Sequence, residues 1–368
     1  MIMASRISQD RRYMVLALSL GRRGLGRTWP NPAVGAVIVK DGVIVGRGWT
    51  QPGGRPHAEV EALRRAGAAA RGATMYVTLE PCSHHGKTPP CADAIIAAGI
   101  ARVVSALEDP NPEVAGQGHA RLRAAGIDVE IGTGAEAARR DHAGHIRRMA
   151  DGRPHVMLKL AVSADGKAGA AGRRPVAITS EAARERVHLM RAQSDAIMIG
   201  IGTALADDPM LTCRLPGMAQ YSPVRIVLDS ALRLPPDSRL VKSAPQTPLW
   251  VIAGRRAPHS VREALQAKGV AVLDVEENDG RLDLAAVLKL LALRGITRVM
   301  VEGGPTLAAC LLAADLVDEA NLLRSATIVG ADGIVALDSS GEAALKRSLK
   351  LVKTEQIGPD QQQIYERG

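Results

Sequence analysis

A histidine, a glutamate and two cysteines in the N-terminal third of the chain have the types and spacing of a metal-dependent hydrolase site. His57 and Glu59 stand in the segment Pro-His-Ala-Glu, and eight residues separate Cys82 from Cys91. One imidazole and two thiolates are good zinc ligands, and three protein ligands leave the fourth position to water. Zinc lowers the pKa of that water, and a carboxylate beside it can move the proton to a substrate. These four residues therefore indicate hydrolysis at a zinc centre.

These residues can share one site only if His57 and Cys91 lie at the beginnings of two helices. Glu59 follows His57 by two positions, so on an ideal helix the two side chains would point apart. Both reach one site only if His57 lies at the helix entrance, which residues 53–56 (Gly-Gly-Arg-Pro) favour. Thr88 is predicted to cap a second helix with proline in its first turn, so that Cys91 lies at the helix start. The helix dipole there favours a thiolate.

Each of these features has an ordinary structural explanation when it is taken alone. A His-x-Glu at a helix start is commonly an exposed polar face, and cysteines are often buried as small apolar residues. His84 and His85 are alternative ligands in the same loop. In combination, the residues match the signature of zinc-dependent nucleobase deaminases. They depart from it in one respect, since that signature has two residues between its cysteines.

Alternating strand and helix patterns around these residues predict an α/β domain. A hairpin is predicted at residues 34–46, with Asp41-Gly42 at its turn. Further strands are predicted at 74–79, 102–107 and 127–131, and helices at 57–70, 90–98 and 118–125. Helices that cover a mostly parallel sheet are the natural arrangement of such a pattern. The apolar segment 14–20 is too short to span a membrane and is predicted as part of a first helix that ends near Gly24.

The pattern is interrupted at residues 149–154 and then restarts, which predicts a second α/β domain before a β-rich end. Strands are predicted at 155–162, 196–201, 224–229, 249–253, 270–275 and 298–302, and helices at 181–192, 261–268, 283–294 and 305–314. No helix is predicted directly after residue 201, because Asp207-Asp208-Pro209 interrupts the pattern. A chain of 368 residues is long enough for two cores, and we expect domains at residues 1–150 and 151–368.

The composition narrows the class of protein. Apolar residues make up 46% of the chain, which excludes long disorder, whereas aromatic residues make up only 2%, with no phenylalanine. So few rings argue against a broad base-stacking surface for single-stranded nucleic acid. The formal net charge of +9 favours anionic partners, and four cysteines are too few for a disulfide scaffold. We expect a cytoplasmic protein without membrane segments.

Several segments of the first half closely resemble the bifunctional pyrimidine deaminase–reductases of riboflavin biosynthesis. They are residues 31–39, the His57 motif, residues 78–91 with this family's own long insert between the cysteines, and residues 109–118. The resemblance implies a cytidine-deaminase-like three-layer α/β/α domain that binds one zinc ion per chain. The residues it implies are His57, Cys82 and Cys91 as zinc ligands, Glu59 as the proton shuttle and Asn31 on the substrate side.

The residues of the second half give weaker signals by themselves. The segment 302–306 (Glu-Gly-Gly-Pro-Thr) follows a predicted strand, and its glycines and helix start suit either a phosphate or a plain turn. The segment 200–205 also follows a strand, but it lacks the third glycine of the Rossmann fingerprint. We therefore infer no Rossmann domain.

The family resemblance continues through residues 159–167, 178–180, 191–196, 202–212, 225–230 and 301–307 and implies a dihydrofolate-reductase-like α/β domain that uses NADPH. The residues implied to line the NADPH site are Ala161, Ala177, Thr203, Asp207, Ser230, Gly304, Pro305, Thr306 and Leu307. The residues implied to face the substrate are Pro175, Arg191, Leu211, Arg214 and Glu302. The two arginines suit a phosphate group. Pro175 stands where the family can have a hydroxyl residue, and Ala177 where an aromatic ring can lie beside the cofactor.

Together the two halves predict two successive steps on one phosphorylated metabolite. The resemblance implies zinc-dependent deamination of 2,5-diamino-6-ribosylamino-4(3H)-pyrimidinone 5′-phosphate, then reduction of the ribosyl group to give 5-amino-6-ribitylamino-uracil 5′-phosphate. A zinc deaminase of nucleic-acid bases or other nucleotides, with a degenerate reductase-like domain, is the alternative enzyme. A non-enzymatic sensor would instead hold a structural zinc, with a fourth ligand from His84 or His85. We expect a small-molecule substrate and a homo-oligomer, with no nucleic-acid or membrane partner.

Overall fold

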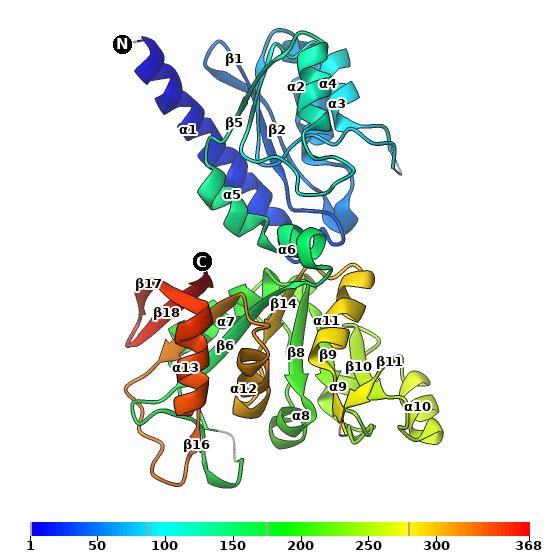
Figure 1. Ribbon diagram of the computed structural model, residues 1–368, viewed down its shortest axis with the longest axis vertical. Coiled ribbons are helices and arrows are strands. Elements are labelled where there is room, and N and C mark those ends of the chain that lie inside the picture. Colours follow the sequence, from blue (N-terminus) through cyan, green and yellow to red (C-terminus); the bar gives the residue numbers. More distant parts are fainter. Residues whose placement is uncertain (1, 87, 174–175, 279) are drawn as a thin grey trace. The chain divides into compact units, whose positions relative to one another are not determined.

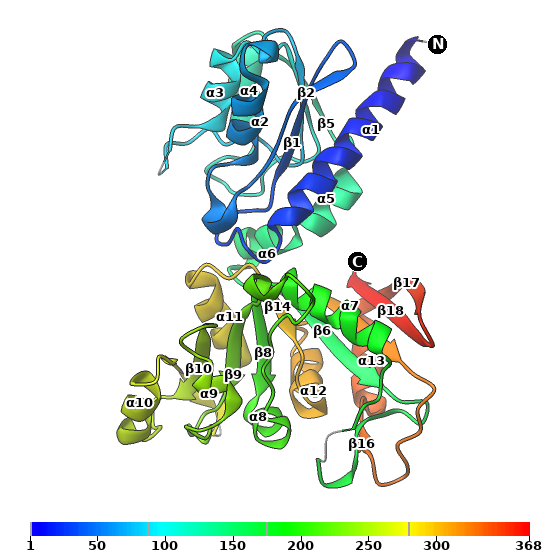
Figure 2. The same ribbon diagram turned by 180° about the vertical axis from the view of Figure 1, so that it is seen from behind.

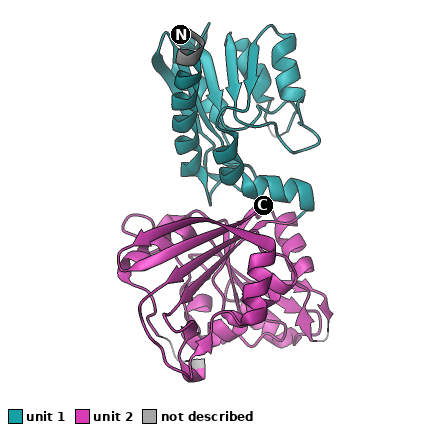
Figure 3. Ribbon diagram, turned by 60° about the vertical axis from the view of Figure 1, so that its left-hand side comes forward, with its two compact units in different colours: residues 1–152 teal, residues 153–368 magenta. Residues whose placement is uncertain are grey.

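The computed structural model of the chain describes residues 2–86, 88–173, 176–278 and 280–368. Residues 1–152 and 153–368 form two compact units, here called unit 1 and unit 2, each built on its own sheet (Figure 3). Both units mix helices and strands, which confirms the predicted α/β class. Among the helices of the described residues, none is long and apolar enough to cross a membrane.

Unit 1 is a five-stranded mixed sheet between two layers of helices (Figures 1 and 2). The strand order is β2-β1-β3-β4-β5, with β1 antiparallel to both neighbours and β3, β4 and β5 parallel. Helices α1 and α5 lie on one face, and α2, α3 and α4 on the other. The elements are α1 (Ile2–Gly21), β1 (Gly35–Lys40), β2 (Val43–Trp49), α2 (Ala58–Ala66), β3 (Thr74–Val77), α3 (Cys91–Ala97), β4 (Arg102–Ser105), α4 (Gln117–Ala124), β5 (Asp128–Ile131), α5 (Ala135–Asp141) and α6 (Ala143–Asp151).

Two glycines of β2 allow helix α2, and with it His57, to lie close to the sheet. A Cβ atom at Gly46 would be 2.3 Å from the carbonyl oxygen of Ala62, and one at Gly48 would be 2.3 Å from that of Ala58. A side chain at either position would therefore force the helix away from the strand. Ala58 and Ala62 are themselves completely buried, so small residues on both elements set the height of the helix above the sheet.

Unit 2 is built on a nine-stranded sheet in the order β11-β10-β9-β8-β14-β6-β15-β18-β17. The seven strands from β11 to β15 in this order are parallel, and β18 and β17 complete the sheet as an antiparallel pair. Helices α12 and α13 lie on one face (Figures 1 and 2). Helix α7 lies on the other, where Val187 and Met190 belong to one apolar cluster with Met157 and Met300 of the sheet.

The elements of unit 2 include two short two-stranded sheets, β7 with β16 and β12 with β13. They are β6 (His155–Val162), β7 (Lys167–Gly169), α7 (Glu181–Ala192), β8 (Ala196–Gly200), α8 (Ile201–Asp207), β9 (Val224–Leu228), α9 (Arg239–Lys242), β10 (Leu249–Gly254), α10 (His259–Gln266), β11 (Ala271–Val275), β12 (Glu277–Asn278), β13 (Arg281–Leu282), α11 (Leu284–Leu293), β14 (Arg298–Val301), α12 (Pro305–Ala313), β15 (Glu319–Arg324), β16 (Ile334–Val335), α13 (Ser339–Ser348), β17 (Leu349–Ile357) and β18 (Asp360–Arg367).

The described residues form five helices that the sequence patterns did not predict, namely α5, α6, α8, α9 and α13. Helix α8 begins directly after β8, and Asp208 ends it in the left-handed region at φ 37°, so the Asp-Asp-Pro segment terminates this helix instead of preventing it. Helix α13 interrupts the region predicted as β-rich, and the carboxylate of Asp338 caps it by accepting a hydrogen bond from the backbone N–H of Gly341. The predicted interruption at 149–154 is shorter than expected, because α6 continues to Asp151.

Candidate active sites

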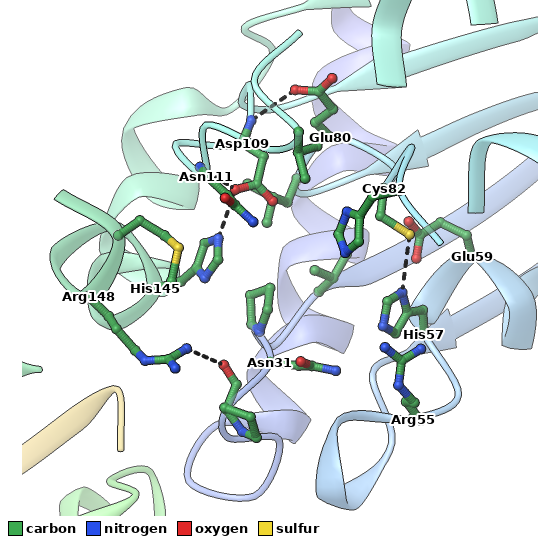
Figure 4. Close-up of a pocket in the computed structure, with 17 residues that line it drawn as sticks. Asn31, Arg55, His57, Glu59, Glu80, Cys82, Asp109, Asn111, His145 and Arg148 are labelled. Atoms are coloured by element: carbon green, nitrogen blue, oxygen red, sulfur yellow. Dashed lines mark hydrogen bonds and ion pairs between the residues drawn. The ribbon is translucent and has the colours of Figure 1, made fainter. Parts of the chain in front are cut away.

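The three predicted zinc ligands converge at the starts of helices α2 and α3 in unit 1 (Figure 4). His57 precedes α2 with extended backbone, at φ −69° and ψ 160°, which is the helix-entrance position required for it to share a site with Glu59. Its Nδ1 lies 3.3 Å from Sγ of Cys91 and 3.8 Å from Sγ of Cys82. Tetrahedral zinc, with bonds of about 2.0 Å to nitrogen and about 2.3 Å to sulfur, would separate such atoms by about 3.5 Å. The donor set and its spacing fit zinc.

The N-terminus of α3 favours ionisation of Cys82. The helix begins at Cys91 after Pro90, whereas Thr88, the predicted cap, accepts a hydrogen bond from Arg55 instead. The backbone N–H of Cys91 donates to Sγ of Cys82 at 3.3 Å. The side chain of Cys91 first, and then His57 and this N–H, lower the pKa of the Cys82 thiol against the opposing effect of burial. The helix start, which was expected to stabilise the thiolate of Cys91, therefore stabilises that of Cys82 instead.

Glu59 lies in the first turn of α2 beside the three ligands and is only 3% exposed. Burial raises the pKa of its carboxyl group, and the nearby His57 opposes that rise. Figure 4 shows this carboxyl group next to the sulfur of Cys82. A carboxyl group that binds a proton readily at such a place can take a proton from water and return it to a substrate.

In the described part of the chain, no fourth protein donor converges on this centre. His84 and His85 are both exposed, and His84 lines the adjoining pocket without joining the three donor atoms. A structural zinc site normally has four protein ligands. The arrangement therefore leaves a position for water or substrate, which argues against the purely structural interpretation.

A pocket adjoins the three ligands, and Asn31 lies in its wall as predicted for a substrate-side residue (Figure 4). The side-chain Nδ2 of Asn31 donates a hydrogen bond to the carbonyl oxygen of Gly54 at 2.8 Å. This bond fixes the amide and leaves its Oδ1 as an acceptor for a ligand. Arg55 and Arg148 bring positive charge to the same pocket.

Sequence reasoning missed the opposite wall of this pocket, which Asp109, Asn111 and His145 form. Oδ1 of Asp109 accepts from the backbone N–H of Asn111 and from Nε2 of His145, both at 2.9 Å. Buried Glu80 accepts from the N–H of Asp109 and holds the start of this loop. The segment 109–118 was part of the family resemblance, but nothing in the sequence indicated that α6 would bring His145 to it.

The predicted cofactor residues of unit 2 gather at one edge of the large sheet. Ala161 lies in β6, Thr203 follows β8, Ser230 follows β9, and Gly304 to Leu307 follow β14. These four strands are parallel and consecutive in the sheet, so their carboxyl ends meet at one edge. Ligands of open α/β sheets bind at such an edge.

The start of helix α12 gives this edge room for a phosphate. Gly304 caps the helix with Pro305 in its first turn, and its backbone N–H donates to Oγ1 of Thr203 at 3.1 Å. A Cβ atom at Gly304 would meet only that hydroxyl, and one at Gly200 would meet nothing within 4 Å. Open backbone N–H groups at a helix start bind phosphate well. The edge therefore fits a dinucleotide cofactor such as NADPH.

Two further predicted cofactor residues lie outside the group of sheet-edge contacts just described. Asp207 is exposed in the last turn of α8, and Ala177 is exposed before α7. Pro175, which was predicted to face the substrate, lies outside the described residues. The structure therefore supports the sheet-edge group more directly than these positions.

On the substrate side, Arg191 and Glu302 form a bidentate ion pair that sequence reasoning had not paired. Nε and Nη2 of Arg191 donate to the two carboxylate oxygens at 2.9 Å each, and Nη1 donates to the carbonyl oxygen of Thr212 at 3.0 Å. Lys159, which was missed, places Nζ 3.5 Å from Oε1 of Glu302. Burial alone would raise the pKa of Glu302, but Arg191 and Lys159 lower it to about 2.

The remaining substrate residues border this ion pair. Leu211 is buried with φ 56°, and Arg214 is exposed three positions further along. A lysine among the apolar residues 156–162 of β6 is a signal that could have pointed to Lys159. Its partner was not readable, because Glu302 follows β14 (Arg298–Val301), a strand distant in the sequence that becomes the neighbour of β6 only in the folded sheet.

Comparison with known proteins places both units in one family. A sequence model of the RibD C-terminal domain matches residues 154–362, and one of the cytidine and deoxycytidylate deaminase zinc-binding region matches residues 7–107. Riboflavin biosynthesis protein RibD of Escherichia coli strain K12 is 45% identical over 369 residues, covering 96% of this chain and 98% of that protein. Its counterpart in Aquifex aeolicus is 40% identical over 353 residues, covering 95% and 96%.

Solved structures give the same result over the whole chain. Acinetobacter baumannii RibD is similar with a TM-score of 0.87 and 37% identity, covering 98% of this chain and 99% of that one. A diaminohydroxyphosphoribosylaminopyrimidine deaminase/5-amino-6-(5-phosphoribosylamino)uracil reductase from Thermotoga maritima has a TM-score of 0.85 and 34% identity, covering 99% and 100%. These matches confirm the family resemblance, the two predicted domain folds, and zinc and NADPH as the cofactors. The chain belongs to the RibD family, the bifunctional zinc-dependent deaminases and NADPH-dependent reductases of riboflavin biosynthesis.

Proposed function

We propose that each unit of the chain carries out one step on the same nucleotide. The domain at residues 1–150 deaminates 2,5-diamino-6-ribosylamino-4(3H)-pyrimidinone 5′-phosphate. The domain at residues 151–368 then reduces the ribosyl group and gives 5-amino-6-ribitylamino-uracil 5′-phosphate. The observation that carries this proposal is a pair of different sites in one chain. Unit 1 has three metal-ligand side chains beside a buried carboxyl group, and unit 2 has a sheet edge that suits a phosphate beside a charged cluster.

In the deamination step, the chain's own groups position the substrate and move protons. His57, Cys82 and Cys91 hold zinc, which when bound activates water for attack near neutral pH. Glu59 would take one proton from that water and pass it to the ring nitrogen, and would then move the second proton, from the hydroxyl group added to the ring carbon, to the amino group, which departs as ammonia. Oδ1 of Asn31, left open by its bond to Gly54, accepts from the pyrimidinone.

In the reduction step, the residues at the sheet edge hold NADPH, which supplies the hydride to C1′ of the ring-opened ribosyl group. Thr203, Ser230 and residues 304–307 would line the cofactor, and the helix start at α12 offers backbone N–H groups that suit a phosphate. Glu302 acts as a fixed anion, since its low pKa keeps it ionised at neutral pH. Lys159 and Arg191 hold this anion in place from two sides, with Nζ of Lys159 3.5 Å from Oε1 and Nε of Arg191 2.9 Å from Oε2.

The electrostatics of both sites support a free phosphorylated substrate. Arg55 and Arg148 border the pocket of unit 1, and Arg191 and Arg214 border the cluster of unit 2. A chain with 2% aromatic residues offers little surface for stacking bases, which favours the small molecule over nucleic acid. We also expect the enzyme to act in the cytoplasm and to self-associate. The molar mass of the purified protein in solution measures its self-association directly.

The test is to supply the purified full chain with the diaminopyrimidinone phosphate and NADPH and to follow ammonia release and NADPH loss together. We expect one NADPH consumed for each ammonia released. Deamination without NADPH loss would refute the reductase assignment. Release of ammonia from RNA or DNA bases at a comparable rate would favour the nucleic-acid deaminase instead.

A further inference from the structure

His188 of helix α7 lies in the charged cluster of unit 2 but has no part in the steps described above. It precedes Arg191 by three positions, so the two side chains share one face of the helix, and the ring is half-buried. Its Nδ1 lies 3.3 Å from the backbone nitrogen of Arg214 and 3.5 Å from Nη1 of Arg191. Both of these nitrogens only donate hydrogen bonds. Nδ1 must therefore accept, and the ring proton resides on Nε2.

The charged groups around His188 oppose a second proton on the ring. Burial lowers the pKa of His188, and the guanidinium groups of Arg191 and Arg214 lower it further, whereas Glu302 and the backbone carbonyl of Thr212 act in the other direction without reversing the shift. A proton on Nδ1 would also replace two accepted hydrogen bonds by donor–donor contacts. The imidazole is therefore a neutral donor at neutral pH.

Two hydrogen-bond donors of the cluster, on His188 and Arg214, remain available for a ligand. Arg191 already directs its guanidinium at Glu302 and Thr212. By contrast, the contacts of His188 with Arg191 and Arg214 are both at Nδ1, so they leave Nε2 available, and the guanidinium of Arg214 forms no hydrogen bond with the residues that the structure describes. A phosphate group offers three strong acceptor oxygens. Two donors of this kind, on residues that both lie next to Arg191, suit a phosphate.

We propose that His188 is a substrate-binding residue of the reductase site, where its Nε2–H donates to the phosphate of the ribosyl substrate beside Arg214. This inference rests on the proposed reductase function and extends it. A neutral donor adds a hydrogen bond without placing a third positive charge beside Glu302. The ion pairs of Glu302 with Arg191 and Lys159 are thereby left intact.

The test compares His188→Asn with His188→Gln and the wild type, all as the full chain. The Asn side chain can place an acceptor where Nδ1 lies, which keeps the contact with the N–H of Arg214, but it has no donor at the Nε2 position. The Gln side chain reaches the Nε2 position with its NH2 group. Loss of one hydrogen bond to a charged group predicts about a 10-fold rise in KM for His188→Asn with kcat nearly unchanged, and partial recovery of KM in His188→Gln. His259→Asn, at an exposed position of α10, is the matched control and is expected to change neither value.

Two measurements separate this inference from the proposed function. Ribose 5-phosphate, titrated calorimetrically, is expected to bind the wild type about 10-fold more tightly than His188→Asn, whereas ribose without phosphate is expected to show no such difference. Nitrogen NMR of histidine-labelled chain is expected to show the neutral Nε2–H form at neutral pH. Equal binding of ribose 5-phosphate by both proteins, or a ring protonated on Nδ1, would overturn the inference and leave the reductase assignment standing. Binding of ribose 5-phosphate without reduction of the nucleotide would instead refute the reductase assignment alone.

Discussion

Glu59 in unit 1 and Glu302 in unit 2 are both carboxyl groups in sites with little access to water, yet their surroundings shift their pKa values in opposite directions. Around Glu59, burial dominates and raises the pKa, because the adjacent His57 compensates only in part. Around Glu302, Arg191 and Lys159 outweigh burial and lower the pKa to about 2. Glu59 is therefore suited to carry a proton, and Glu302 to remain a fixed negative charge. The same side chain serves two chemistries because its neighbours differ.

The two sites also differ in how the chain assembles them. The metal centre draws on residues 57 to 91, which two helix starts bring together. The cluster of unit 2 draws on Lys159, Arg191 and Glu302, which come from three separate elements of one large sheet and its covering helix. Because the sites are built independently, changes in one are expected to leave the other working.

Removal of a metal ligand is expected to have the largest effect and to separate the two activities. Cys91→Ser replaces a thiolate of the centre and should abolish zinc retention and ammonia release. Reduction of the already deaminated nucleotide by NADPH should continue at the wild-type rate. Zinc content by elemental measurement and the two separate assays check this, with Cys310→Ser of α12 as the cysteine control that keeps its zinc. Loss of both activities in a folded Cys91→Ser protein would contradict independent sites.

Removal of the fixed charge in unit 2 is expected to have the next largest effect. Glu302→Gln leaves Arg191 and Lys159 buried without their anion, which should destabilise the chain by about 3 kcal/mol and lower kcat/KM for reduction about 100-fold. Ammonia release should be unchanged. Thermal unfolding and the two assays measure these effects. Glu342→Gln, which removes only an exposed ion pair of α13, is the control and should cost less than about 1 kcal/mol. An unaltered reduction rate in Glu302→Gln would show that the charge is not needed.

The pH dependence of stability should reveal the low pKa of Glu302. The pKa of Glu302 is depressed to about 2 in the folded chain from an ordinary value of 4.5, so its contribution is fully present above about pH 4.5. It is lost as the pH falls from there toward about 2, and its full size is on the order of 3 kcal/mol. The difference in unfolding free energy between wild type and Glu302→Gln should therefore be constant above about pH 5 and shrink below it. A difference that grows on acidification would contradict this sign.

An added aromatic ring beside the cofactor is expected to have the smallest effect. Ala177 is exposed at the position where the family can carry such a ring. Ala177→Trp should lower KM for NADPH several-fold, by roughly 1 kcal/mol of stacking, with kcat and ammonia release unchanged. Steady-state titration with NADPH measures this. A KM that does not move would show that residue 177 lies away from the cofactor.

Much of unit 1 was predictable because its signals are local. The Asp41-Gly42 turn, with φ of 50° and 79°, and the helix entrance at His57 follow from residues next to each other in the sequence. The pocket wall at His145 was not predictable, since it depends on how α6 packs against the loop at Asp109. Position along the chain says nothing about such a contact until the tertiary structure brings the two segments together.

Unit 2 was predictable element by element but not as a site. The six central strands β6, β8, β9, β10, β11 and β14 appeared in the sequence pattern, yet the pairing of Lys159 with Glu302 requires that β14 insert between β8 and β6. Helix α8 was missed because the residues that end it were taken as preventing it. Strand order is set by long-range packing, and no spacing in the sequence encodes it.

One chain holds two independent sites, and Glu59 is expected to carry protons in the first. Glu59→Gln keeps the size of the side chain and removes its acid–base chemistry. Supplied separately with the diaminopyrimidinone phosphate and with its deaminated product plus NADPH, this variant is expected to retain zinc, release ammonia about 1,000-fold more slowly, and consume NADPH at the wild-type rate. Undiminished ammonia release, or loss of NADPH consumption together with ammonia release, would contradict the account.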